Sequence, residues 1–95
     1  MNRDPFVDVI MPNYNKGEFL EESIDSVLAQ EYKNWNLFVI DNSSNDNSKE
    51  ILNKFQVEKP NINIIYLSRN MGAALCQFIS KELKTFILNY NLINH

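Results

Sequence analysis

Cysteine, histidine and glycine are scarce in this chain of 95 residues, and each shortage excludes a class of protein. The one cysteine, Cys76, excludes an internal disulfide framework. The only histidine is His95, so a histidine-based catalytic triad or metal cluster is not expected. Neither a P-loop nor a dinucleotide-binding fingerprint is present, because the two glycines, Gly17 and Gly72, lie far apart.

Long apolar runs and an excess of basic residues are also missing. No run approaches the roughly 20 apolar residues that cross a bilayer, and the polar, acid-bearing residues 1–5 do not resemble a signal peptide. Nine Lys and Arg against twelve Asp and Glu argue against nucleic acid as a partner. We therefore expect a single small cytoplasmic domain, not transmembrane, with peripheral association at the inner face of the membrane left open.

Apolar strand patterns alternate with helical patterns along the chain. Residues 6–11, 35–40 and 62–67 are short runs rich in apolar and β-branched residues, and the first is expected to stop before Pro12. A helix that begins in a capping box at Asn15 is expected to follow the first strand, a second helix capped by Asp46 or Asn47 the second, and a third helix the last. The prediction is an α/β fold of three β-α units, a three-layer α/β/α arrangement on a Rossmann-like, mostly parallel sheet.

Function in such a sheet is expected beyond the carboxyl ends of the strands. The first end offers Tyr14, which could stack on a planar base or could simply cover the first helix. The second offers Asp41 and Asn42, which could bind a base edge, a ribose or a metal, or could only form a turn. The third offers Arg69, a guanidinium suited to phosphate, or an ordinary surface residue. The residues alone leave each pair of alternatives open.

Four segments in order resemble family 2 inverting glycosyltransferases with the GT-A fold. Residues 7–15 resemble the opening strand and loop of that family, and residues 19–30 its first helix. Residues 38–48 are similar to its V-D-D/N-x-S-x-D-x-S signature, and residues 68–74 to its R-N-x-G-x-A turn. Each motif is weak alone, but together they indicate a partial GT-A fold over about residues 6–76.

The resemblance implies that the three strand ends hold the nucleotide of a nucleotide-diphosphate sugar, a UDP-sugar foremost. Tyr14 and the Pro12 backbone would lie against the base and ribose. Asp41 and Asn42 would meet the base edge, and Arg69 would lie toward the base or the diphosphate.

The resemblance ends before the catalytic part of the family. No aspartate follows Asp46, so the D-x-D motif through which the family holds Mg²⁺ or Mn²⁺ is absent, and no metal ligand or catalytic residue is expected here. Residues 1–76 are assigned to the N-terminal part of the family domain, and residues 77–95 to a helical continuation with a divergent tail. We expect a chain cut short by truncation or frameshift.

Two functions are compatible with these features. The first is the donor-nucleotide-binding part of an enzyme that transfers a sugar from a nucleotide-diphosphate sugar to an acceptor hydroxyl, inactive alone. The second is a non-catalytic module that binds a nucleotide or another protein. An open sheet edge would favour self-association in that second case.

Overall fold

Strands and helices alternate in the computed structural model, which describes residues 7–59 and 61–83. The elements are β1 (Val7–Asn13), α1 (Gly17–Leu28), β2 (Trp35–Asp41), α2 (Ser48–Glu58), β3 (Ile62–Tyr66), the 3₁₀ turn η1 (Gly72–Ala74), α3 (Leu75–Gln77) and the π-helical turn η2 (Phe78–Leu83). Across these described residues, no helix is long and apolar enough to cross a membrane.

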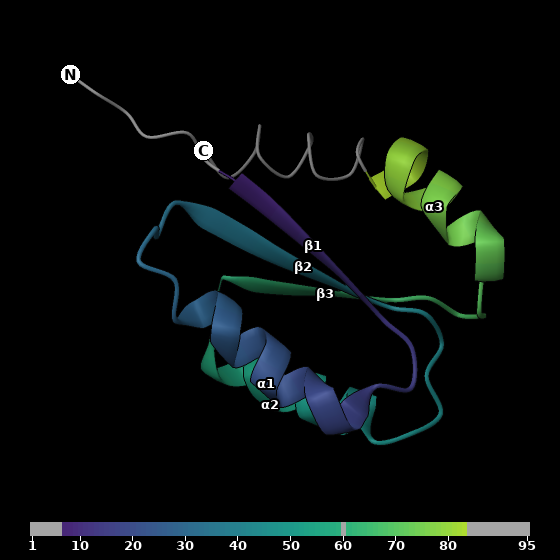
Figure 1. Cartoon of the computed structure of the whole chain (residues 1–95). Helices are drawn as coiled ribbons and strands as arrows, with labels where there is room; N and C mark the ends of the chain where they lie inside the picture. The colour runs from purple at the N-terminus through teal and green to yellow at the C-terminus, as the bar shows by residue number, and fades with distance from the viewer. Residues whose placement is uncertain (1–6, 60, 84–95) are drawn as a thin grey trace.

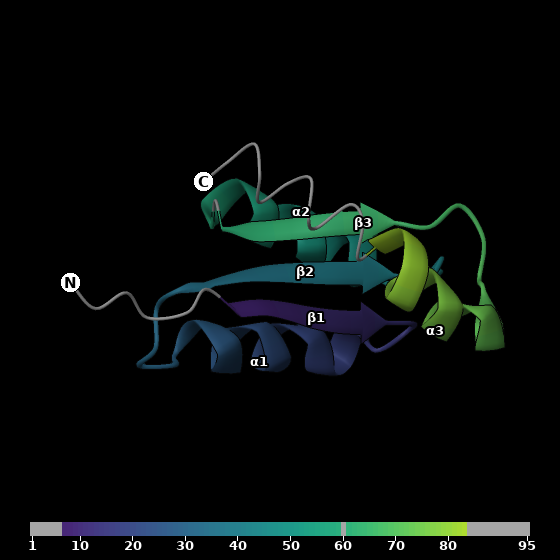
Figure 2. The same ribbon diagram turned by 90° about the horizontal axis from the view of Figure 1, so that it is seen from above.

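The three strands form one parallel sheet in the order β1-β2-β3 (Figure 2). β1 pairs with β2 from Val7 opposite Trp35 to Asn13 opposite Asp41, and Asp41 in turn lies opposite Tyr66 of β3. This register ends all three strands at one level, so the loops that follow them emerge at the same edge of the sheet.

The central strand separates two apolar layers. α1 and α2 cover one face of the sheet, and the segment that includes α3 lies on the other side (Figure 1). Every residue of β2 is buried, which explains its nearly continuous apolar sequence. The core on the helix α1–α2 side contains Leu20, Ile24, Trp35, Leu37, Val39, Leu52, Phe55 and Ile62. On the other face, the buried Phe38 and Ile40 contact Leu75, Phe78 and Ile79, among others.

The first strand continues through Pro12, so the prediction that it stops before this proline is wrong. Val7 N–H donates to the Asn34 carbonyl, and the Asn13 carbonyl accepts from Asn42 N–H, both at 2.8 Å. Alternation along the strand then directs the backbone of Pro12 away from β2. Proline therefore removes no hydrogen bond of the ladder here, as is usual for proline in an edge strand.

The third helical segment is less regular than the sequence predicts. It begins as a 3₁₀ turn at Gly72, which has a φ of +52°, and becomes π-helical from Phe78. Leu75 and Ile79 pack against the sheet as their helical spacing predicts. Most of the predicted tail, residues 84–95, lies outside the described part of the chain.

Candidate functional site

The loops after the three strands are joined where the strands end. Beyond the last paired residues, Asn42 N–H donates to the Asn13 carbonyl at 2.8 Å, and Leu67 N–H donates to the Asp41 carbonyl at 2.9 Å. The sheet ladder thus extends into the loops and fixes where each one begins.

The buried carboxylate of Asp41 connects the end of β1 with the loop that follows β2. It is fully buried, and its Oδ1 accepts from Asn13 Nδ2 at 3.0 Å and from Ser44 Oγ at 2.6 Å, while its Oδ2 accepts from Ser44 N–H at 3.2 Å. A buried carboxylate requires such donors, because it has lost its contact with water. Burial, and secondly the negative charge of Asp41, raise the pKa of the neighbouring Tyr66.

Ser44 extends this network into the loop between β1 and α1. Its Oγ accepts from Asn15 N–H at 2.9 Å, and Asn15 Oδ1 accepts from Asn45 N–H at 2.8 Å. Asn15 therefore does not form the predicted capping box with Glu18. It has a φ of +51°, and the N-cap of α1 is Lys16, which makes no side-chain capping bond.

Asp46 accepts a backbone hydrogen bond from the first residue of two helices. Its Oδ2 accepts from Gly17 N–H at 3.0 Å at the start of α1, and its Oδ1 accepts from Ser48 N–H at 2.9 Å at the start of α2. Of the two residues expected to cap the second helix, Asn47 is the N-cap but makes no side-chain capping bond, and Asp46 accepts the N–H of the first helical residue. The contact of Asp46 with α1 is an addition. Hydrogen bonds from the Ser48 hydroxyl and from the Gly17 amide lower the pKa of Asp46. A carboxylate in this position also interacts favourably with two helix dipoles.

Asn42 fixes the third loop. The residue is buried, and its Oδ1 accepts from Met71 N–H at 2.9 Å. Next to it, Asn70 Oδ1 accepts from Gly72 N–H at 2.7 Å, which closes the turn at the glycine. The loop that carries Arg69 is therefore anchored to the end of β2 by a side chain.

The structure divides the five residues predicted for the site into two groups. Asp41 and Asn42 are buried and hold the loops together. Pro12, Tyr14 and Arg69 are exposed, Tyr14 to 45%, and are available to a ligand. Sequence reasoning did not identify the part played by Ser44, whose signal is its spacing, three residues after an aspartate at a strand end.

The described residues do not fit a divalent metal. No group of three or more His, Cys, Asp or Glu side chains gathers among them. The two aspartates near the strand ends, Asp41 and Asp46, already accept N–H and O–H hydrogen bonds from the chain itself. We therefore derive no chemistry through a metal ion in this chain.

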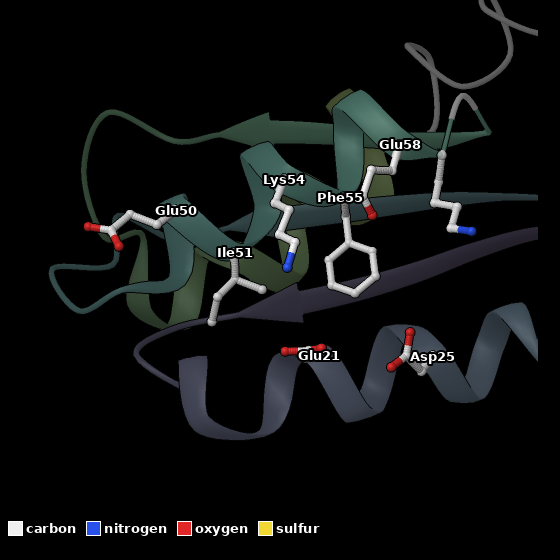
Figure 3. A pocket seen from close by; sticks show the side chains of 8 residues that line it. Glu21, Asp25, Glu50, Ile51, Lys54, Phe55 and Glu58 are labelled. Atoms are coloured by element: carbon white, nitrogen blue, oxygen red, sulfur yellow. The ribbon is translucent and has the colours of Figure 1, made fainter.

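A second feature of the surface lies away from the strand ends. A hollow of about 450 Å³ separates α1 from α2, and Figure 3 shows Glu21 and Asp25 of α1 facing Lys54 and Phe55 of α2. None of the five predicted site residues lines this hollow. The carboxyl edge of the sheet, and not this groove, is the candidate site.

Comparison with known proteins identifies the family. The profile of glycosyl transferase family 2 matches residues 8–82, which is most of the chain. The chain belongs to this family. The match begins in β1 and ends in η2, so it includes all three strand ends and the hydrogen-bond network that joins them.

Relatives and solved structures agree with this assignment. The teichuronic acid biosynthesis glycosyltransferase TuaG of Bacillus subtilis is 34% identical over 76 residues, which are 80% of this chain and 30% of that protein. The mannosyltransferase PcManGT of Pyrobaculum calidifontis, solved with GDP-Man and Mn²⁺, matches with a TM-score of 0.68 at 25% identity, over 76% of this chain and 22% of its own. TarS of S. aureus in complex with UDP matches with a TM-score of 0.64 at 25% identity, over 74% and 21%.

These proteins confirm the partial GT-A fold and show how much of it is present. The chain spans less than a third of the length of each relative. The relatives therefore share with it the three-stranded unit described above, and their remaining length has no counterpart here.

Proposed function

We propose that this chain is the donor-nucleotide-binding part of a family 2 glycosyltransferase and that it does not transfer sugar by itself. In the whole enzyme, a sugar would pass from a nucleotide-diphosphate sugar to an acceptor hydroxyl. The observation that supports this proposal is the convergence of Tyr14, Asn42 and Arg69 on one edge of the sheet, on loops that buried side chains hold together.

The exposed residues would make the first contacts with the nucleotide. Tyr14 would stack on the base beside the Pro12 backbone, a contact worth about 1–3 kcal/mol where base–aromatic stacking has been measured. Arg69 would lie toward the diphosphate, because its fork of N–H donors matches phosphate oxygens. A UDP-sugar is the first candidate, in keeping with the UDP bound to TarS, although PcManGT was solved with GDP-Man.

The buried residues would act at the base edge and on the loops. Asn42 has both donor and acceptor groups, so its amide could pair with a base. Asp41 is fully buried and its Oδ2 accepts one hydrogen bond, from Ser44 N–H, so a base N–H would reach this carboxylate only if the loops around it moved. We therefore assign Asp41 a positioning part as well as a place at the base edge.

Calorimetry with UDP and with GDP tests the binding. Stacking of about 1–3 kcal/mol converts to a 5- to 150-fold weaker affinity for Tyr14→Ala, and Arg69→Ala should weaken UDP more than uridine. Matched controls are Tyr32→Ala, at the opposite end of the sheet, and Lys54→Ala, in the groove between α1 and α2. Equal affinities for the Tyr14→Ala variant and the wild type would refute the assignment.

An assay of sugar transfer tests the absence of catalysis. The pure chain is incubated with UDP-glucose or GDP-mannose, with Mn²⁺ or Mg²⁺, and with acceptors that a full-length relative such as TuaG or PcManGT accepts. No turnover is expected, because the described residues contain no metal-binding group and we expect no general base among them that could reach an acceptor. Turnover at a rate near that of the relative would overturn the proposal.

Two narrower expectations accompany this function. The division at residue 76 stays a prediction that limited proteolysis can check. The cytoplasmic location, with or without attachment to the inner face of the membrane, also stays a prediction, and cell fractionation checks it.

A further inference from the structure

Tyr14 stands between two asparagines that bond to the loop after β2. Asn13 is buried, and its Nδ2 donates to Asp41 Oδ1 at 3.0 Å. Asn15 is half-buried, and its N–H donates to Ser44 Oγ at 2.9 Å. The phenol of Tyr14 has no hydrogen-bond partner among the described residues, so hydrogen bonds act on this exposed ring only through its two neighbours.

Asn15 contacts the second loop twice. Besides its N–H bond to Ser44, its Oδ1 accepts from Asn45 N–H at 2.8 Å. Two bonds to consecutive residues fix both the position and the orientation of Asn15, which a single bond does not. Figure 1 shows the two loops leaving the sheet at the same end, on their way to α1 and α2. Ser44 also donates to the buried Asp41 carboxylate at 2.6 Å, so the anchor on the β2 side is itself fixed.

The backbone of Asn15 restricts which residues can make these contacts. Its φ of +51° lies in the left-handed region, which glycine adopts freely and which asparagine and aspartate tolerate better than most other residues. The same residue must carry an acceptor that reaches the Asn45 N–H. Glycine meets the first requirement but not the second, and aspartate meets both. Substitutions at position 15 can therefore separate the contribution of the backbone from that of the side chain.

We propose that Asn15 is a positioning residue of the nucleotide site, which holds the Tyr14 ring in place for the base before the nucleotide binds. This inference rests on the proposed function, in which Tyr14 stacks on the base. A ring that is already held in its bound position loses less conformational freedom on binding than a ring on a loose loop. Without the anchor, that freedom is lost when the nucleotide binds, and immobilising one side chain weakens affinity about 2- to 12-fold.

Calorimetry of the full 95-residue chain with UDP tests the proposal. Asn15→Gly keeps the left-handed backbone but removes the acceptor, so it should weaken UDP binding about 2- to 12-fold. Asn47→Gly is the matched control and should bind UDP like the wild type, because Asn47 is an exposed asparagine whose side chain makes no capping bond. Asn15→Asp keeps the acceptor. It should bind uridine like the wild type, since uridine has no phosphate for the new charge to repel.

A double-mutant cycle separates positioning from a general loosening of the site. In the Tyr14→Ala background no ring remains to be positioned, so Asn15→Gly should leave the UDP affinity unchanged. A structural role, in which Asn15 supports the loops beneath the nucleotide, predicts the same loss in both backgrounds. Circular dichroism of every variant confirms that it is folded.

Fluorine NMR of the chain labelled with 3-fluorotyrosine observes the ring directly and without nucleotide. Tyr14→Phe identifies the Tyr14 signal. In the wild type this signal should lie away from that of free 3-fluorotyrosine, because the ring has a fixed environment, and Asn15→Gly should move it toward the free value. The signals of Tyr32 and Tyr66, which lie outside this loop, should not move.

The outcomes distinguish this inference from the function on which it rests. If the wild type binds neither UDP nor GDP, or if Tyr14→Ala binds as tightly as the wild type, the proposed function fails, and Asn15 has no ring to position for a base. If Tyr14→Ala weakens binding but Asn15→Gly does not, or if Asn15→Gly weakens it equally in both backgrounds, only the positioning inference is overturned. A wild-type Tyr14 signal at the free 3-fluorotyrosine value overturns it as well, because the ring is then not held before binding.

Discussion

Ser44→Ala should destabilise the fold far more than its single lost hydroxyl suggests. The hydroxyl donates to the buried Asp41 carboxylate at 2.6 Å and accepts from Asn15 N–H at 2.9 Å. A hydrogen bond to a charged group is worth about 1.5–3 kcal/mol, and an ordinary one about 1 kcal/mol. The expected loss in the free energy of unfolding is therefore about 2–4 kcal/mol, a large part of the roughly 5–14 kcal/mol available to a domain of this size.

Urea unfolding followed by circular dichroism measures this loss. In a thermal melt of the same variant, the midpoint temperature should fall by roughly 10–30 °C, since 1 kcal/mol shifts it by about 4–8 °C in a domain this small. Asn45→Ala is the matched control, because this exposed neighbour contributes only its backbone N–H to the network.

A second substitution separates the carboxylate from the hydroxyl. Asp41→Asn keeps the shape of the side chain but turns an N–H₂ group toward Asn13 or Ser44, which themselves donate to this position. It should cost at least as much as Ser44→Ala. If Ser44→Ala stays within about 0.5 kcal/mol of the control, as an ordinary surface change does, the loops are not held by this network and the reasoning is wrong.

Three further predictions concern the loops. The free energy of unfolding should fall as the pH drops below about 3.8, because hydrogen bonds lower the pKa of Asp46 in the folded state and the stability that they contribute is lost when Asp46 is protonated. When melting temperature is measured against pH, Asp46→Asn should flatten this part of the profile. Gly17→Ala should lower the melting temperature, because a Cβ there would lie 3.0 Å from the Asp46 carboxylate oxygen that the Gly17 N–H binds, while the exposed Asn47 side chain can turn away. A Gly17→Ala variant as stable as the wild type would show that Asp46 also adjusts without cost. Gly72→Ala should lower the free energy of unfolding, measured in urea, by about 1–2 kcal/mol, because a φ of +52° disfavours a residue with a Cβ even though the space around it is open. No measurable loss would indicate that the turn relaxes.

The sequence is sufficient to predict the strands and their order because each signal is local. The apolar run of β2 predicts burial on both faces, and every residue of it is buried. Pro12 is the exception. A proline usually ends a strand, and only the side of β1 on which its nitrogen falls, a property of the assembled sheet, allows the strand to continue.

The sequence identifies the residues of the site, but it does not predict which of them are buried and hold the loops and which are exposed to a ligand. Asp41 and Tyr14 both stand at strand ends, and nothing in their local sequence indicates that one is fully buried and the other 45% exposed. Ser44 and Asn15 form a contact 29 residues apart in sequence, which no local pattern encodes. Asp46 shows the same limit, since its bond to α2 follows from the sequence but its bond to α1 does not.

The burial of Asp41 links stability and nucleotide binding in a way that can be measured. If a base N–H is to reach this buried carboxylate, the loops that cover it must move, so the nucleotide would gain little affinity there. Stacking on the exposed Tyr14 displaces no contact and would supply more. Tyr14→Ala should therefore weaken UDP binding without changing the unfolding free energy, whereas Asp41→Asn should lower both. A variant of Asp41 with normal stability and lost binding would show instead that the carboxylate is free to meet the base.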